Sequence, residues 1–370
     1  MGILLQVIFF ILLLYIFLIT RYIFGWKKIN KTKYDSFSPN VSIVIALRNE
    51  EKVVSRLLTS LQSQIYDINK LEIILVNDHS NDSTLELLKE SDLENIHILN
   101  MPNGQNGKKK AIFRGINFAS GEIIITSDAD CTFHPNWVGK MVSYFFNDEV
   151  KLVSGPVSLE KKQGILQNFQ ALDFLSLIVS GAGAIGVKDP IFCNGANMAY
   201  RKDVFIQFND FNDSKTVSGD DVFLLHNLKE KYPKSIVFAK DKDVIVSTSS
   251  EKNLSNYINQ RKRWASKSSE YKDFSSIYVS YLVFLTNLCF VLLIFMVMFD
   301  ISFFKFLCYF YFIKYIVDLV LLYPILKFLK REDLTKWIFP FEFFYSFYII
   351  LIIILSNTQN FVWKGRVHIK

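Results

Sequence analysis

The chain has 370 residues, of which 51% are hydrophobic and 21% charged, and its formal net charge is +7. Its basic residues gather beside apolar segments, which is typical of contact with anionic lipid headgroups, so we expect membrane lipids and no nucleic acid as partners. The four cysteines have neither close pairing nor metal-ligand spacing, which excludes a disulfide-stapled secreted domain and suits a reducing cytoplasm.

The first segment, residues 2–24, is almost continuously apolar and long enough to cross a hydrocarbon core of about 30 Å. A cleaved signal peptide is the alternative, but a positive start, a short apolar core and a small-residue cleavage site are all missing. Basic residues follow the segment and none precedes it, which places the next domain in the cytoplasm. We therefore expect a membrane anchor within residues 1–26.

The middle of the chain, residues 27–275, alternates between apolar runs and helical patterns. The predicted strands lie at 41–46, 72–76, 96–99 and 122–126, with helices at 50–65, 83–91 and near 109–119. Later elements are short strands near 150–154, 236–240 and 243–247, and helices near 163–179 and 221–230. This alternation predicts an α/β fold with a mostly parallel, Rossmann-like sheet covered by helices.

Three more apolar stretches follow within residues 276–357, at 277–299, 303–326 and 338–356. The first two predict a hairpin. The third either spans the membrane, leaving the basic tail at 358–370 outside, or lies at the interface and keeps that tail inside. Lys314 and Asp318 are one helical turn apart, and intramembrane charges of this kind most often pair or face a protein interior.

Carboxylates follow two of the predicted strands. Asp78 comes after one of them, and Asp128 and Asp130 stand where another ends. Ligands of open parallel sheets bind beyond the carboxyl ends of the strands. Asp78 could accept hydrogen bonds from a uracil ring or a ribose, or it could simply turn the chain. The Asp-x-Asp pair offers the hard oxygen ligands that Mg²⁺ or Mn²⁺ prefers.

Two further acids, Asp220 and Asp221, precede an apolar helical pattern. They could cap that helix. Alternatively, adjacent carboxylates repel each other, which raises a pKa toward the range that suits a general base acting on a hydroxyl.

Gln260, Arg263 and Trp264 are spaced to share one helix face, with Arg261 and Lys262 turned elsewhere. The alternative is a basic helix that rests on lipid headgroups, supported by the nearby Lys252, Lys267 and Lys272. Both descriptions hold together if a lipid acceptor reaches a helix at the membrane surface.

Taken in order, these segments resemble the membrane-bound inverting glycosyltransferases of family 2 over roughly residues 40–265. The resemblance is carried by residues 41–51, 77–80, 128–130, 219–221 and 260–264, with 107–116 and 194–197 as further similar segments. It implies a GT-A fold, a nucleoside-diphosphate sugar donor, with UDP favoured, and Mg²⁺ or Mn²⁺.

The resemblance also implies roles for individual residues. Asp221, with Asp220 beside it, would be catalytic, and Asp130 would bind the metal. The donor-binding residues would be Glu50, Asp78, Lys108, Asp128 and Arg263, and the acceptor-binding residues Asn197, Gln260 and Trp264. Lys108 departs from the family pattern because Lys109 and Lys110 follow it, where small residues are more usual.

The expected function is transfer of one or a few sugars to a lipid or lipid-linked acceptor at the cell membrane, by a multi-pass protein with a cytoplasmic catalytic domain. A processive polysaccharide synthase is the alternative, although its channel usually needs more than four apolar stretches. A transporter or receptor that only binds nucleotide sugars is an alternative of another class. Lys314 and Asp318 support it, but an ordered set of acids with an Arg-Trp helix exceeds what binding alone requires.

Overall fold

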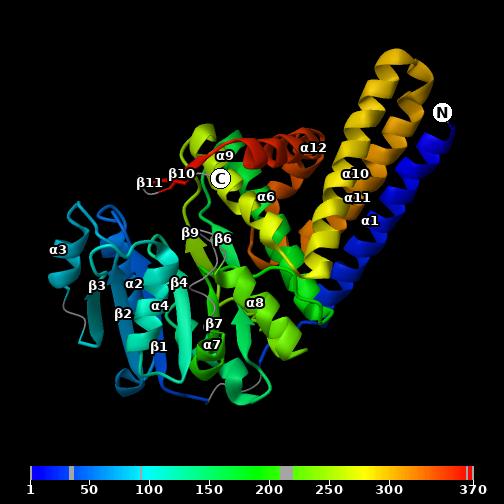
Figure 1. Ribbon diagram of the computed structural model, residues 1–370. Coiled ribbons are helices and arrows are strands. Elements are labelled where there is room, and N and C mark those ends of the chain that lie inside the picture. Colours follow the sequence, from blue (N-terminus) through cyan, green and yellow to red (C-terminus); the bar gives the residue numbers. More distant parts are fainter. Residues whose placement is uncertain (1, 33–36, 92–93, 209–219, 364–365, 369–370) are drawn as a thin grey trace.

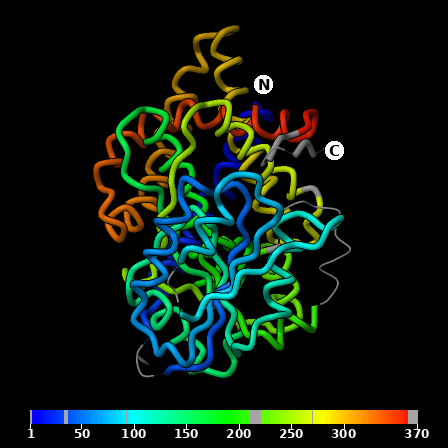
Figure 2. Tube along the Cα trace, turned by 90° about the vertical axis from the view of Figure 1, so that its left-hand side faces the viewer, coloured from blue at the N-terminus to red at the C-terminus, as the bar shows by residue number. Residues whose placement is uncertain are grey.

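The computed structural model describes residues 2–32, 37–91, 94–208, 220–363 and 366–368. A sheet with its helices forms one end of the molecule, and long apolar helices project from the other (Figures 1 and 2). The main sheet has seven strands in the order β3-β2-β1-β4-β7-β5-β8.

Four parallel strands form one half of this sheet, and each coincides with a predicted strand. They are β1 (Val41–Leu47), β2 (Leu71–Asn77), β3 (Ile96–Asn100) and β4 (Ile123–Asp128). Continuous runs of Val, Ile and Leu form such strands because helices cover both faces of a parallel sheet. The α/β fold with a mostly parallel sheet is therefore confirmed.

The other half of the sheet contains a strand that the sequence did not predict. This strand, β7 (Met198–Arg201), runs antiparallel to β4 and to β5 (Leu152–Ser154), and β8 (Ile236–Phe238) pairs in parallel with β5. A separate parallel ribbon joins β6 (Val157–Leu159) to β9 (Val246–Thr248). These strands have three or four residues, too few for an alternating pattern to appear in the sequence.

Shorter helices connect the strands. They are α2 (Val54–Gln62), α3 (Thr84–Lys89), α4 (Lys108–Phe118), α5 (Trp137–Val142), α7 (Lys202–Gln207), α8 (Asp220–Lys231) and α9 (Leu254–Ala265). The 3-10 turn η4 (Ser266–Glu270) extends α9 toward the apolar helices.

Five helices in the described part of the chain are long and apolar enough to cross a membrane. Four were predicted: α1 (Gly2–Lys28), α10 (Phe274–Phe299), α11 (Phe304–Phe328) and α12 (Thr335–Thr358). The fifth, α6 (Ile165–Gly186), was predicted only as a shorter helix of the middle domain.

The apolar character of α6 is explained by its packing against α1. Gly25, Gly183 and Gly186 lie where the two helices meet, and a Cβ atom added to Gly183 would stand 2.5 Å from the carbonyl oxygen of Tyr22. Small residues at such a crossing let the two backbones approach closely.

The last long helix takes a different course from the others. Helices α1, α10 and α11 run side by side, whereas α12 turns away from them and extends toward α9 (Figure 1). After it, β10 (Phe361–Trp363) and β11 (Arg366–His368) form a small antiparallel ribbon in what was predicted only as a basic tail.

Charged side chains meet between α1, α11 and α12. Lys314 lies 2.9 Å from Asp318 and also pairs with Glu342 of α12, and all three residues are buried. Tyr15 of α1 donates a hydrogen bond of 2.6 Å to Asp318. The predicted pairing of Lys314 with Asp318 is therefore confirmed, and it joins three helices.

Candidate active site

Asp78 and Asp128 lie on either side of the carboxyl end of β1. In the parallel register Leu47 is level with Asn77 and Ala46 with Asp128. In the sheet, β1 has β2, the next strand of the chain, on one side and β4 on the other, so the strand order reverses at β1. Such a switch point is where open α/β sheets bind their ligands.

A single dipeptide in front of α4 connects these two acids. Gly107 donates its backbone N–H to the Asp78 carboxylate at 3.0 Å, and Lys108 forms an ion pair with Asp128. Gly107 has a φ of +104°, a conformation that costs a glycine little. The structure thus brings together three of the residues predicted to bind the donor.

Glu50, another predicted donor residue, opens the first turn of α2. Its N–H donates to the hydroxyl of Thr84 at 2.7 Å, and its carbonyl accepts hydrogen bonds from Val53 and Val54. The backbone of Glu50 therefore fixes the loop after β1 against α3, beside the loop that carries Asp78.

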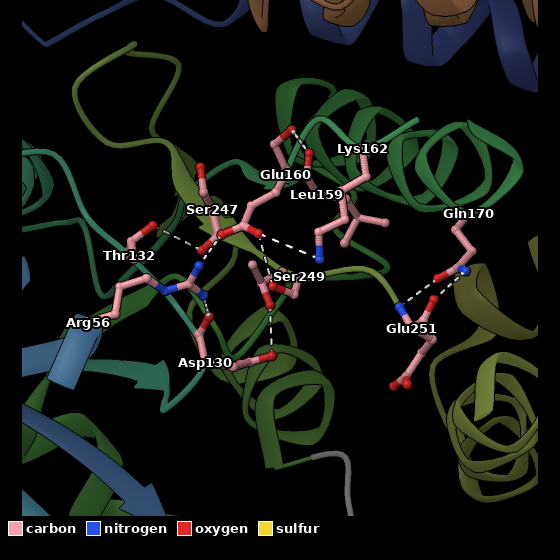
Figure 3. Close-up of polar contacts among 12 residues, drawn as sticks. Arg56, Asp130, Thr132, Leu159, Glu160, Lys162, Gln170, Ser247, Ser249 and Glu251 are labelled. Atoms are coloured by element: carbon pink, nitrogen blue, oxygen red, sulfur yellow. Dashed lines mark hydrogen bonds and ion pairs between the residues drawn. The ribbon is translucent and has the colours of Figure 1, made fainter. Parts of the chain in front are cut away.

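Asp130 is held through both its side chain and its backbone. One carboxylate oxygen accepts a hydrogen bond of 2.8 Å from Thr248, and the carbonyl accepts one of 3.0 Å from Arg56. Arg56 also pairs with Glu160 (Figure 3).

The carboxylates after β4 suit a divalent cation. Mg²⁺ is usually held by one or two carboxylates together with substrate phosphates, and Asp128 and Asp130 supply carboxylates of this kind. Across the described ranges no three His, Cys, Asp or Glu side chains gather in one place. The other ligands of such a cation would be phosphate oxygens or water.

Asp221 lies half-buried at the start of α8. Its carboxylate accepts hydrogen bonds from the N–H groups of Gly195 at 3.0 Å and Val222 at 2.9 Å, and Lys267 lies 3.6 Å away. Burial raises the pKa of Asp221, but Lys267, the two N–H donors and the charge of Lys108 outweigh burial and hold that pKa below its ordinary value.

The prediction of a raised pKa for this base was therefore wrong, because Lys267 and two backbone N–H donors outweigh the effect of burial. Asp220 begins α8, but its side chain and the preceding Gly219 lie outside the described residues. Lys267 was predicted to support contact with lipid headgroups, and that was also wrong, since its ammonium pairs with Asp221 in the protein interior.

Helix α9 positions its predicted residues on one side. Asn253 caps the helix by accepting a hydrogen bond from the N–H of Asn256. Gln260 donates to the carboxylate of Glu251 at 3.1 Å, while Arg263 and Trp264 are half-buried.

Arg261 and Lys262, which lie between Gln260 and Arg263 in α9, point elsewhere, as predicted. Arg261 is buried against Asp173 of α6 at 2.7 Å, and its guanidinium covers the ring of Trp264 at 4.3 Å. Lys262 donates to the side chain of Gln359 after α12 at 3.3 Å. Both residues tie α9 to the apolar helices.

Asn197, predicted to bind the acceptor, is fully buried instead. Its side-chain oxygen accepts a hydrogen bond of 3.0 Å from Trp137, and its amide nitrogen donates to the carbonyls of Pro156 and Val244. The prediction that this side chain contacts the acceptor is therefore corrected: its hydrogen bonds join the start of β7 to neighbouring segments. The segment meets Asp221 through the backbone of Gly195.

The remaining predicted residues form two groups, one around residues 107–108 and one beside α9. Asp78 and Asp128 gather around residues 107–108, and the charge of Lys108 also acts on Asp221. Residues 248–251 link Asp130 to Gln260. Asp221 pairs with Lys267 of η4, directly after α9. The contacts of these acids therefore run from the ends of β2 and β4 to α9 and to the turn after it.

Sequence reasoning missed the supports of this region. The long-range contacts are those of Arg56 and Thr248 with Asp130, of Gln170 with Glu251, and of Asp173 with Arg261. Residues 248–251 look like an ordinary polar turn before a helix, and the chain offers no local signal of their contacts.

Comparison with known proteins agrees with this fold. The fold and the acids after its parallel strands define a GT-A type architecture, and residues 42–207 match the family model Glycosyl transferase family 2. The chain thus carries a glycosyltransferase family 2 domain. A mannosyltransferase from Pyrobaculum calidifontis, solved with GDP-Man and Mn²⁺, has a similar fold, with a TM-score of 0.58, 15% identity, and coverage of 96% of this chain and 97% of that one.

Three curated relatives are similar over the domain alone. Glycosyltransferase AglE of Haloferax volcanii is 32% identical over 34% of this chain and 42% of its own. An undecaprenyl-phosphate 4-deoxy-4-formamido-L-arabinose transferase of Pectobacterium atrosepticum is 40% identical over 28% and 33%. A poly-beta-1,6-N-acetyl-D-glucosamine synthase of Staphylococcus aureus is 29% identical over 37% and 33%. The matches thus span well under half of each relative.

Proposed function

We propose that this protein is a membrane glycosyltransferase that moves a sugar from a nucleoside-diphosphate sugar to a lipid or lipid-linked acceptor, with inversion at the anomeric carbon. The observation that carries this proposal is that Asp78 and Asp128 meet at residues 107–108, while Asp221 is held by Gly195 and Lys267, in a chain with long apolar helices. The mannosyltransferase of similar fold binds GDP-Man, and UDP is the nucleotide that we favour for this chain.

In the proposed reaction Asp221 takes the proton of the acceptor hydroxyl as its oxygen attacks the anomeric carbon. The bond from that carbon to the diphosphate breaks, and its electron pair leaves with the phosphate oxygen. Arg263 stabilises the departing charge. Asp78 binds the nucleoside, and Gln260 and Trp264 line the acceptor side.

Asp130, with Asp128, would hold Mg²⁺ or Mn²⁺ at the end of β4. When bound, this cation supplies charge neutralisation for the diphosphate. Lys108 and Arg263 would add positive charge from α4 and α9, and Glu50 would keep the loop after β1 in place.

The acceptor class is supported by the apolar helices and by the relatives' names, one of which is an undecaprenyl-phosphate transferase. The polysaccharide synthase among the relatives makes a processive polymerase the second candidate. The basic residues that follow α1 support a cytoplasmic catalytic domain. Because α12 turns away from α1, α10 and α11 toward α9 (Figure 1), an interfacial position for this helix is favoured over a spanning one.

A donor screen tests the proposal. The full-length protein in nanodiscs is incubated with Mn²⁺, native lipid extract and a panel of UDP-sugars and GDP-sugars, and the release of nucleoside diphosphate is measured. We expect release with at least one donor that depends on the lipid extract. Binding of a nucleotide sugar without any release would instead support a transporter or receptor.

Replacing Lys267 is expected to move the pH profile of the reaction. The depressed pKa of Asp221 keeps its carboxylate ionised as the pH falls, and the rate is lost only below that pKa. Lys267→Ala removes the strongest opposing charge, so burial raises the pKa of Asp221 and the acid limb of kcat/KM moves to higher pH. The substitution leaves in place the other titratable groups that interact with this carboxylate, which are Lys108, Tyr271 and His226.

The matched control for this prediction is Lys272→Ala, which removes an exposed lysine of the same segment. Its profile should overlay that of the wild type. If Lys267→Ala, correctly folded, gave the wild-type profile as well, Asp221 would not be the group that titrates.

A further inference from the structure

The segment Thr248–Glu251 connects two parts of the proposed active site within four consecutive residues. It leaves the ribbon strand β9 and leads into α9. Its first residue contacts Asp130, and its last contacts Gln260 (Figure 3 shows the side chains around it).

Thr248 is firmly placed before it reaches Asp130. Its carbonyl accepts a hydrogen bond of 2.8 Å from the N–H of Glu160, and the preceding Ser247 exchanges backbone hydrogen bonds of 2.9 and 3.1 Å with Thr132. The hydroxyl of Thr248 then donates to one oxygen of the Asp130 carboxylate at 2.8 Å. A fixed donor of this kind sets the rotation of that carboxylate.

Ser249 supplies a second route to the same aspartate. Its hydroxyl donates to Glu160 at 3.0 Å, and Glu160 pairs with Arg56. Arg56 in turn donates to the carbonyl oxygen of Asp130 at 3.0 Å. Asp130 is therefore held from its side chain and its backbone by one connected set of residues.

Glu251 fixes the other end of the segment. Its N–H and carbonyl form hydrogen bonds of 2.9 and 3.0 Å with the amide of Gln170, which is 1% exposed in α6. Its carboxylate accepts a hydrogen bond of 3.1 Å from Gln260. The clamp from Gln170 leaves this carboxylate little freedom to move away from α9.

We propose that residues 248–251 are a positioning element, in which Thr248 orients the Asp130 carboxylate for a divalent cation and Glu251 orients Gln260 for the acceptor. The inference rests on the proposed function. Neither residue is catalytic. Partners that orient a metal ligand commonly contribute 10- to 100-fold to metal affinity, and Thr248 falls in this class.

The test measures Mn²⁺ binding directly. The full-length protein is titrated with Mn²⁺ in the presence of UDP, and in parallel GDP, and free Mn²⁺ is followed by electron paramagnetic resonance. Thr248→Val keeps the shape of the side chain and loses only the hydroxyl, so its affinity for Mn²⁺ should fall about 10-fold. Thr248→Ser should restore it. The matched control, Thr59→Val, removes the hydroxyl of an exposed threonine of α2 that bonds to the Ser55 carbonyl, and it should bind like the wild type.

The possible failures are distinguishable. If the wild type binds Mn²⁺ and Thr248→Val binds it equally well, the positioning role is overturned and the proposed glycosyltransferase function stands. The positioning role is likewise overturned if Thr59→Val weakens Mn²⁺ binding as much as Thr248→Val does. If the wild type itself fails to bind Mn²⁺ with either nucleotide, the metal-dependent form of the proposed function falls, and this inference falls with it.

Discussion

Asp221→Asn is expected to lower the turnover number by about 10³-fold while leaving the affinity for the donor unchanged. The amide has nearly the shape of the carboxylate but cannot take up the proton of the acceptor hydroxyl. The measurement is kcat at saturating donor and lipid, with the donor Kd determined separately by calorimetry. A large effect on kcat alone is the signature of a group that acts in the transition state.

The control for this substitution is Asp148→Asn, which changes an acid whose side chain is 98% exposed. It should retain wild-type turnover. An Asp221→Asn protein that bound donor and kept more than a tenth of the wild-type rate would remove Asp221 as the base, and attention would turn to other acids of the site.

Lys314→Met is expected to lower the free energy of unfolding of the apolar bundle by about 3–5 kcal/mol. The substitution leaves Asp318 and Glu342 buried together without their cation, next to the hydroxyl of Tyr15. Thermal unfolding in detergent, followed by the loss of monodisperse protein, measures the effect.

Glu342→Gln is the matched comparison, because it removes one of two acids and leaves Lys314 paired one to one with Asp318. It should be clearly milder than Lys314→Met. Equal stability of Lys314→Met and the wild type would contradict a structural role for this cluster and would revive a transport role for its charges.

The sequence was sufficient where structure depends on local pattern. The apolar runs of β1, β2 and β4 each fill a central strand, and the acids that follow them lie at one edge of the sheet because parallel strands end together. The pairing of Lys314 with Asp318 could likewise be predicted, since residues four apart on a helix are neighbours.

Contacts between distant parts of the chain could not be predicted. The pKa of Asp221 moves opposite to expectation because Lys267 approaches from a turn after α9. The role of Asn197 changes because Trp137 is buried against it. Gly183 and Gly186 of α6 pack against Tyr22 and Gly25 of α1, and neither segment alone indicates the other.

The most direct test of the account is the chemical identity of the product. Full-length protein in nanodiscs receives Mn²⁺, native lipid extract and the radiolabelled donor selected by the screen, and the lipid-soluble product is examined by mass spectrometry and nuclear magnetic resonance. We predict a lipid that carries the sugar with anomeric configuration opposite to that in the donor, formed by the wild type and not by Asp221→Asn. Label that remained on the nucleotide, or a product with retained configuration, would contradict the account.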